Sequence, residues 1–444
     1  MGLKSRWVSL LLVLLASIFT CSLLINDVFY PSAALSTIPE YAFSEKSSSR
    51  AVEELLQRPF CLNPVHREMC LEAEQVHRWY QQHFDSREQR FANKLKCRGR
   101  PVRIGHNLDK WFQFVHQRAK ELESCPVKCE AFNRDDILRN RIKDLDVLVG
   151  LNGVMKCQAA QLNHRAKRAM LSLERMNHGL GWGPGLQTVK DFDMVISFNH
   201  LADIPINYFH VLNSDGCEAK FKCLENSMAY SWIENSSTWE FWNKSLKTFG
   251  ALIVSNCEGR RMDLFKSLEK EGVSLTKSGR CFRQKFNITQ LLKSSPHSAD
   301  MNVPRAWLQE KFAFTKFFPF YFGFENGIEM DYLTEKFWLG LRMGNIPVIF
   351  GAPNLRDYWP FDSHPPWIDV LDFHNVSELS HELKSLFRNS TRYREKLRSL
   401  NELSPSDFET FINHWTNSSF RATGENSILC RICQYMHEHF CEED

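Results

Sequence analysis

Short apolar runs alternate with polar turns and amphipathic stretches along the second half of the chain. Two of them read FYFGF at 320–324 and IPVIF at 346–350, and a polar turn, Glu325-Asn326-Gly327, follows the first. This alternation predicts strand–helix–strand units in a parallel sheet, with further strands at 251–255, 273–276 and 367–371. Ligands bind beside the carboxyl ends of strands in such sheets, so the turn after 324 is a candidate site.

The first half predicts a second α/β unit. Short strands are expected at 101–105, 144–150 and 192–198, and helical stretches at 111–124 and 158–176. Residues 65–95 are charged and helical in pattern, and nothing in their composition assigns them a role. A chain of 444 residues exceeds one core, so two domains are expected.

The amino terminus predicts a membrane anchor. Lys4 and Arg6 precede a stretch without charge at 7–25, which is long enough to cross a bilayer. The basic residues place the tail 1–6 in the cytosol and the rest in the lumen. A cleaved signal peptide is the alternative, but the stretch is long and lacks a small-x-small cleavage site. The Ser-, Ala- and Pro-bearing residues after it indicate a stem.

The composition fits a lumenal protein. Of the 14 cysteines, those beyond Cys21 are odd in number, so disulfides plus at least one free or intermolecular thiol are expected. A net charge of +3 is too small to indicate a nucleic-acid partner. Six sequons mark candidate glycosylation sites, at Asn235, Asn243, Asn287, Asn375, Asn389 and Asn417.

The segment after residue 324 gathers four kinds of polar group. Asn326, Tyr332, Glu335 and Lys336 supply an amide, a phenol, a carboxylate and an ammonium. If a helix starts near Asp331, the last three share one face. A carboxylate suits ribose hydroxyls, and an ammonium at a helix N-terminus suits a diphosphate.

Residues 324–336, FENGIEMDYLTEK, resemble the donor-binding signature F-E-N-S-x-x-x-D-Y-I-T-E-K of the α1,3/4-fucosyltransferases. The resemblance implies that GDP-fucose is bound by Asn326, Tyr332, Glu335 and Lys336. It also implies the GT-B architecture, two facing Rossmann-like domains behind an anchor and stem, in a Golgi type II membrane protein. Gly327 departs from the signature, where Ser or Thr is common.

A second stretch, VSNCEGRRMDLFKSL at 254–268, resembles a family segment in which V-S-N precedes an arginine and a helix. The resemblance adds Ser255, Asn256 and Arg261 to the donor site, because a guanidinium can hold phosphate in a bidentate manner. Arg260 lies one residue away and leaves the register open. Two solvated surface arginines are the alternative.

A third stretch, ISFNHLADIPINY at 196–208, resembles the family run L-T-Y-R-R-D-S-D-I-x-V-P-Y. Asp203 and Tyr208 match it and become possible acceptor-side or donor-side residues. Asn199 and His200 replace the two arginines, so no charge contact is carried over there.

The reaction implied by the resemblance inverts the sugar's anomeric centre, so a carboxylate must take the acceptor's proton. The family's base lies in W-x-N-x-E-S, and the corresponding residues 169–174, AMLSLE, give Glu174. The Trp and Asn are missing, and Arg175 and Met176 stand where the family has Ser and Pro or Ala. An exposed glutamate on a charged helix is the alternative, and Asp191 and Asp193 are further candidates.

No metal requirement is expected. Asp191-Phe192-Asp193 has D-x-D spacing but lies at the start of a predicted strand, not at its end. Arg261, Lys336 and a helix N-terminus would instead neutralise the leaving GDP.

The cysteine pattern also resembles the family. It implies that Cys430 and Cys433 bridge back to cysteines near the start of the first α/β domain, here Cys125 and Cys129. A zinc site formed by the terminal pair and two nearby histidines is the alternative, His437 and His439. A further bridge between strand ends of the donor domain is implied for Cys257 and Cys281.

The expected organisation is therefore a signal-anchor, a stem with lumenal extension at 26–100, an acceptor-side domain at 101–245, a GDP-fucose domain at 246–425, and a Cys-bearing segment at 426–444 packing on the first domain. The predicted function is transfer of L-fucose to a hydroxyl of N-acetylglucosamine in a glycoprotein glycan, in α1,3-type linkage. The alternatives are a protein O-fucosyltransferase and a non-catalytic lumenal glycan- or nucleotide-binding relative.

Overall fold

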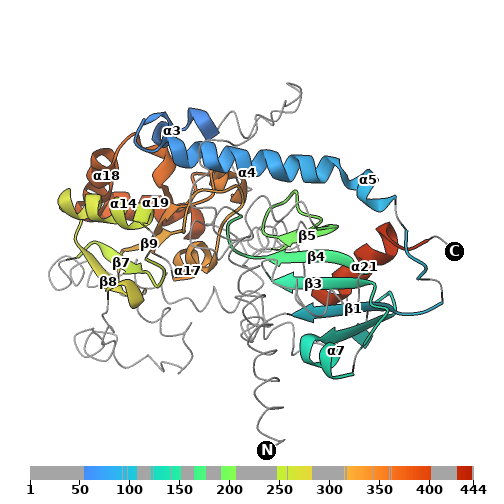
Figure 1. Ribbon diagram of the computed structural model, residues 1–444. Helices are drawn as coiled ribbons and strands as arrows, with labels where there is room; N and C mark the ends of the chain where they lie inside the picture. The colour runs from blue at the N-terminus through green and yellow to red at the C-terminus, as the bar shows by residue number, and fades with distance from the viewer. Residues whose placement is uncertain are drawn as a thin grey trace, which may run out of the picture.

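Figure 1 shows the computed structural model of the chain, with two parallel sheets side by side and helices around them. It describes residues 55–92, 94–97, 99–107, 122–123, 125–140, 142–151, 165–176, 192–206, 248–257, 259–282, 315, 318–343, 345–359, 361, 363–401 and 428–442. The predicted α/β class with parallel sheets is confirmed. The predicted anchor at 7–25 lies outside these residues, and within them no helix is long and apolar enough to cross a membrane.

The first sheet has six parallel strands in the order β2-β1-β3-β4-β5-β6. Their bounds are β1 Val102–Asn107, β2 Cys129–Asn133, β3 Val147–Leu151, β4 Lys167–Ser172, β5 Met194–Ser197 and β6 Ile204–Pro205. The helix α7, Arg134–Asn140, follows β2. The predicted strands near 102, 147 and 194 are confirmed.

The second sheet has five parallel strands in the order β11-β10-β9-β7-β8. They are β7 Gly250–Ile253, β8 Leu275–Ser278, β9 Phe320–Phe324, β10 Ile346–Phe350 and β11 Ile368–Asp369. Chain order reverses between β7 and β9, and in open α/β sheets the ligand crevice lies outside the carboxyl ends of the strands at that point. The loops after β7 and β9 therefore flank the favoured ligand position of this sheet.

Helices cover the sheets and lead into them. Their bounds are α3 Pro59–Leu62, α4 Arg67–Asp85, α5 Arg87–Phe91, α14 Gly259–Lys270, α17 Glu335–Met343, α18 Val376–Arg388, α19 Ser390–Asn401 and α21 Ile428–His439, with 3₁₀ turns at Arg280–Phe282, Leu355–Tyr358 and Val370–Asp372.

The helix predicted at 158–176 is wrong over its described part. Residues 167–172 are the central strand β4, which pairs with β3 on one side and β5 on the other. Its sequence, KRAMLS, contains good helix formers and no β-branched residue, so pairing on both edges overrides local propensity. The helix expected at 111–124 lies almost wholly outside the described residues.

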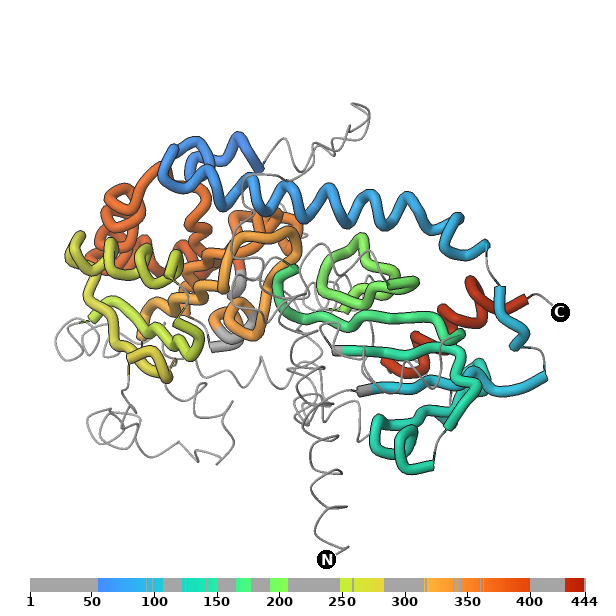
Figure 2. The backbone as a smooth tube through the Cα atoms, viewed as in Figure 1, coloured from blue at the N-terminus to red at the C-terminus, as the bar shows by residue number. Residues whose placement is uncertain are grey.

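The helix α4 packs against both sheets (Figure 2). Its first half, with α3, joins the core of the second sheet through Cys70, Ala73 and Phe60. Its second half joins a cluster on the first sheet that contains Trp79 and Tyr80, with Met170 and Val195 among their neighbours. Residues 65–95, to which the sequence pattern assigned no role, therefore contribute to the cores of both sheets.

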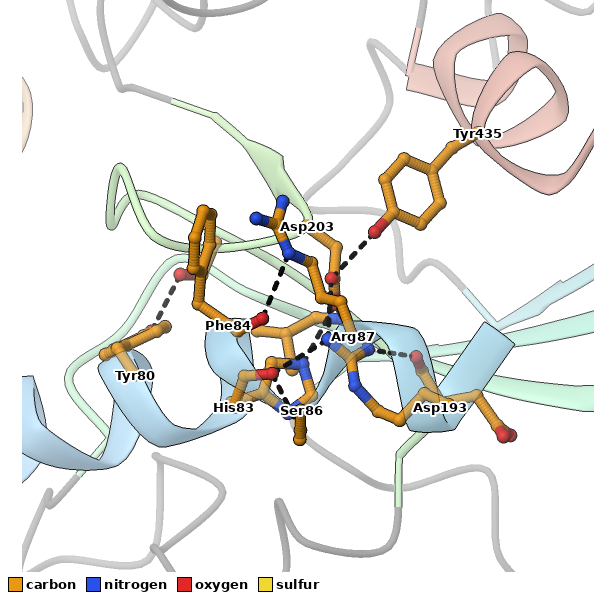
Figure 3. A network of polar contacts seen from close by, with 11 residues as sticks. Tyr80, His83, Phe84, Ser86, Arg87, Asp193, Asp203 and Tyr435 are labelled. Atoms are coloured by element: carbon orange, nitrogen blue, oxygen red, sulfur yellow. Dashed lines mark hydrogen bonds and ion pairs between the residues drawn. The ribbon is translucent and has the colours of Figure 1, made fainter. Parts of the chain in front are cut away.

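A buried carboxylate fastens the far end of this helical segment to the first sheet (Figure 3). Asp203 accepts hydrogen bonds from His83 at 2.9 Å, Arg90 at 3.0 Å and the Tyr435 hydroxyl at 2.7 Å. Burial opposes its charge, but the hydrogen bonds from His83 and Arg90 outweigh burial and lower the pKa of Asp203 to about 2. The network thus joins α4, α5, α21 and the first sheet.

The C-terminal helix α21 packs on the first sheet, although the second sheet precedes it in the chain. Ile432, Met436 and Phe440 lie in one cluster with residues of β1, β3 and β4. Three disulfides hold it there: Cys97–Cys441, Cys125–Cys430 and Cys129–Cys433. The terminal pair is therefore oxidised and not a source of zinc thiolates.

Arg90→Ala should lower the free energy of unfolding by about 3 kcal/mol, because it leaves a buried carboxylate short of its cation. Chemical denaturation at neutral pH measures this loss. The contribution of Asp203 is complete above its ordinary pKa of 3.8 and disappears as the pH falls through about 2. The gap between wild type and variant should therefore shrink over that interval.

Arg103→Ala is the matched control. Its guanidinium pairs at 3.3 Å with Glu130, a carboxylate that is 47% exposed. An exposed pair contributes up to about 1 kcal/mol, so this variant should stay close to wild type. Equal losses from the two variants would contradict a special role for the Asp203 network.

Candidate functional site

The loop after β9 is closed by a buried carboxylate. Glu325 is fully buried and accepts hydrogen bonds from the Thr334 amide at 2.8 Å, the Thr334 hydroxyl at 2.7 Å and Lys336 Nζ at 2.9 Å. The two ends of the loop are thereby held together. Glu325 was not among the predicted site residues, although it is the second residue of the matched signature.

Asp331 corrects the predicted start of the following helix. Its φ is +63°, in the left-handed region that Asp tolerates better than most residues, and α17 begins only at Glu335. Tyr332 therefore precedes the helix and shares no helical face with Lys336. Asn354 donates to Asp331 Oδ1 at 2.7 Å and accepts from the Asp331 amide at 2.9 Å, which fixes this bend.

Asp331 also reaches the first sheet. Its Oδ2 accepts from the His200 amide at 3.0 Å and lies 2.6 Å from His200 Nδ1. This hydrogen bond raises the pKa of His200 against the effect of burial. His200, which replaces an arginine of the family run, thus contacts the donor-side loop at the Asp331 carboxylate.

The predicted base lies beside two predicted donor residues. Glu174 follows the carboxyl end of β4, and its Oε2 accepts from the Tyr332 hydroxyl at 3.0 Å and from Asn326 Nδ2 at 3.5 Å. Burial raises the pKa of Glu174, while the charge of Lys336 and the Tyr332 hydroxyl oppose that rise. The glutamate is on a loop, not on the exposed helix that was the alternative.

Arg261 and Arg260 are clearly different in position. Arg261 is 2% exposed, and its guanidinium donates to the carbonyls of Phe324, at 3.1 Å, and of Asn256. Arg260 points away and pairs with Glu72 of α4 at 2.8 Å. Arg261 is therefore the arginine that links the loops after β7 and β9.

The cations of the two loops lie near each other. Lys336 Nζ contacts Thr334 Oγ1 at 2.7 Å as well as Glu325, and Glu335 lies 3.6 Å away. The pKa of Lys336 is raised, because the Glu325 and Glu335 charges outweigh burial and the positive charge of Arg261. An ion-paired lysine and a buried arginine therefore stand at the crossover of the second sheet.

The remaining donor-side candidates lie on the loop after β7. Ser255 is exposed and its carbonyl accepts from Arg280 at 3.2 Å, while Asn256 is half-buried. Cys257, in the same loop, forms a disulfide with Cys281. Cys61–Cys70, between α3 and α4, was not foreseen.

Two other candidates lie away from this site. Asp203 is enclosed in the α4–α21 network, where His83 and Arg90 hold its carboxylate. Asp193 lies at the amino end of β5, the edge opposite Glu174, and pairs with Lys167 at 3.7 Å. Asp191 and Tyr208 lie outside the described residues, as do Asn235, Asn243, Asn287 and Asn417.

The two described sequon asparagines are exposed at the starts of helices. Asn375 accepts from the Glu378 amide at 2.9 Å and caps α18. Asn389 accepts from the Arg392 amide at 3.0 Å, just before α19. Both positions are open to a modifying enzyme. Among the described residues no group of three or more His, Cys, Asp or Glu side chains could hold a metal ion.

Residues 243–443 match the family model described as glycosyltransferase family 10 (fucosyltransferase), C-terminal. These residues belong to glycosyltransferase family 10. The resemblance read from 324–336 is thus confirmed, and the family 10 match contains the loops after β7 and β9. Glu174 lies before its first residue.

Relatives of known name agree with the family 10 assignment. The chain is 24% identical to a putative fucosyltransferase-like protein of Arabidopsis thaliana over 57% of this chain and 40% of that one. It is 23% identical to alpha-(1,3)-fucosyltransferase B of Drosophila melanogaster over 56% and 54%. GDP-fucose protein O-fucosyltransferase 3 of Xenopus laevis is 40% identical over 18% and 16%. The chain thus spans about half or less of these relatives.

A crystal structure of an alpha1,3-fucosyltransferase aligns with 76% of this chain and 94% of its own, at 16% identity and a TM-score of 0.45.

Arg261→Ala should lower the free energy of unfolding by about 3 kcal/mol, because two carbonyls at the loop crossing lose their buried donor. Arg260→Ala, one residue away, removes a half-exposed ion pair and should cost under about 1 kcal/mol. Denaturant unfolding of both variants tests the assignment. A larger loss of stability in Arg260→Ala than in Arg261→Ala would contradict the assignment of Arg261 as the buried arginine.

Proposed function

We propose that this protein is an inverting fucosyltransferase that moves L-fucose from GDP-fucose to a hydroxyl of a glycoprotein glycan. One observation carries the proposal: the Glu174 carboxylate of the first sheet is held by Tyr332 and Asn326 of the donor-side loop. A base candidate and two donor-site candidates, 152 and 158 residues apart in the chain, therefore meet. The arrangement fits the GT-B architecture expected from the sequence.

The donor would lie at the crossover of the second sheet. There the loop after β7 supplies Ser255 and Asn256, and the segment after β9 supplies Asn326, Glu335 and Lys336. The Lys336 and Arg261 charges would offset the diphosphate, with the N-terminus of α14 beside them. Arg261 already binds two carbonyls, so it would act mainly by shaping the loops and by its field.

Glu174 would act as the general base. The acceptor oxygen attacks the anomeric carbon, its proton passes to Glu174, and the bond to GDP breaks as the new glycosidic bond forms. Burial raises the pKa of Glu174 and so strengthens it as a base, while the Tyr332 hydroxyl and the Lys336 charge keep the ionised form accessible.

The acceptor we propose is N-acetylglucosamine, fucosylated in α1,3-type linkage. The linkage is in the name of the Drosophila relative, and the sugar is in the name of a mouse relative, 4-galactosyl-N-acetylglucosaminide 3-alpha-L-fucosyltransferase 9. A protein hydroxyl is the second candidate, favoured by the 40% identity over 78 residues to a protein O-fucosyltransferase. We also propose a Golgi membrane location with the catalytic part in the lumen. The uncharged stretch at 7–25 and the disulfides, which form in oxidising compartments, support it.

Glu174→Gln should lower turnover by at least about 10²-fold, the usual cost of losing a general base. The amide keeps the hydrogen bond with Tyr332, so GDP affinity should be essentially unchanged. The full-length protein is assayed for GDP release with a glycan panel and with protein acceptors. In the wild type, turnover should fall on the acid side at a pH above the ordinary glutamate pKa, because the pKa of Glu174 is raised.

Glu130→Gln serves as the matched control, since this exposed glutamate of β2 lies in the same sheet. It should retain turnover. Normal turnover in Glu174→Gln would remove Glu174 as the base. GDP binding by the wild type without turnover on any acceptor would favour the non-catalytic relative, and linkage analysis of the product separates glycan from protein transfer.

Turnover should persist in excess EDTA, with Mn²⁺ changing rates only modestly. The physical reason is that Lys336, Arg261 and a helix N-terminus supply the positive charge that a cation would otherwise give. Loss of activity with chelator, restored by Mn²⁺, would overturn the metal-independent mechanism.

A further inference from the structure

Three consecutive residues after β4 contact the donor-side loop. Glu174 contacts Asn326 and Tyr332, Arg175 lies against Gly327, and the Met176 amide donates to Glu329 Oε2 at 3.0 Å. The segment that carries the proposed base is therefore docked on the loop that carries donor residues.

The middle contact depends on a missing side chain. A Cβ added at Gly327 would lie 1.8 Å from Arg175 Nη1, 2.4 Å from Cζ and 3.0 Å from Nε. The guanidinium thus occupies the space that any other residue at 327 would fill. Arg175 is only 6% exposed, so a side chain at 327 would have to displace a buried guanidinium. Both positions depart from the family pattern in opposite senses, large for small at 175 and small for large at 327.

A hydrogen bond reinforces this packing. Glu329 is buried, and burial raises its pKa to about 8 although the positive charge of Arg175 acts against that rise, so at neutral pH the group is mainly uncharged. The Met176 amide donates to the same carboxyl group. The Arg175 side chain and the next amide thus both lie against the loop segment 327–329.

We propose that Arg175 is a positioning residue for Glu174, and that Gly327 is its required partner. By filling the space over Gly327, the guanidinium sets the depth at which the 174–176 segment docks on the donor-side loop. That depth places the Glu174 carboxylate against Tyr332 and Asn326. The inference rests on the proposed role of Glu174 and adds a determinant outside the base and the donor contacts.

The test is a four-protein cycle: wild type, Gly327→Ser, Arg175→Ser, and the double variant. Gly327→Ser should displace the guanidinium and lower kcat by about 10²-fold, the scale of a misplacement near 1 Å. Arg175→Ser should lower kcat by about tenfold, because the guanidinium no longer sets how closely the 174–176 segment packs on the loop. The double variant should regain at least about tenfold in kcat over Gly327→Ser alone, since serine then has space. The KM for GDP-fucose should change little throughout.

Arg168→Ser is the matched control, because this arginine is exposed on the same strand β4. It should leave kcat unchanged. Thermal unfolding of all the variants shows whether coupling between 175 and 327 also appears in stability. If Gly327→Ser alone does not fold, Arg175→Ser and the double variant still decide the matter by their kcat values.

Coupling in kcat with rescue supports the proposal. Coupling in unfolding temperature alone, with kcat unaffected by Arg175→Ser, would reduce the pair to packing and overturn it. A double variant as slow as Gly327→Ser would overturn it too, because the glycine would then be needed for a reason other than Arg175. An inactive wild type refutes the proposed function itself, an outcome distinct from an active wild type that lacks the coupling.

Discussion

A buried carboxylate sets the shape of the candidate site. Glu325 has no exposed surface, so its charge must be hydrogen-bonded inside the protein, and Thr334 and Lys336 supply those bonds. Its own amide donates to the Phe350 carbonyl at 2.7 Å, which ties the loop to β10 as well. The residues between 325 and 334 are thereby confined to one closed arch.

That arch contacts segments of the first sheet, in addition to the packing of α4 against both sheets. Consecutive residues at its far side, Asp331 and Tyr332, contact His200 and Glu174, which follow the carboxyl ends of β5 and β4. Movement of the arch on ligand binding would therefore move both strand-end segments. In the proposed mechanism the second sheet would supply the charge for a diphosphate and the first would supply the carboxylate, so neither would have a complete site alone.

The local sequence pattern predicted the elements that depend mainly on nearby residues. The run from 320 to 350 has the apolar, polar and amphipathic order of a βαβ unit, and its chemistry could be read in place. Strand β4 was mistaken for helix because its residues favour helix and only its two neighbours make it a strand. The start of α17 was placed too early because nothing in the letters around Asp331 shows a positive φ.

Long-range partners were beyond such reasoning. The charged pattern of 65–95 indicated a helix but not that its two halves belong to different cores. Asp203 resembled a site residue because the sequence around it matched the family run. In the structure it is hydrogen-bonded by His83, by Arg90, which is 113 residues away in the chain, and by Tyr435, which is 232 residues away. In the sequence, Arg175 and Gly327 are two separate departures from the family pattern. Only the fold shows that they are in contact.

The return of the C-terminal helix to the first sheet has a consequence for biosynthesis. Cysteines at 97, 125 and 129 find their partners only at 441, 430 and 433, so the first sheet cannot form these three disulfides until residues 430–441 have been made. The second sheet has its strands complete by residue 369 and can form earlier. Maturation therefore runs against the order of synthesis. During that interval the first sheet's apolar face and its thiols remain accessible to chaperones and to disulfide exchange. The final step of folding is therefore the oxidation of these cysteines.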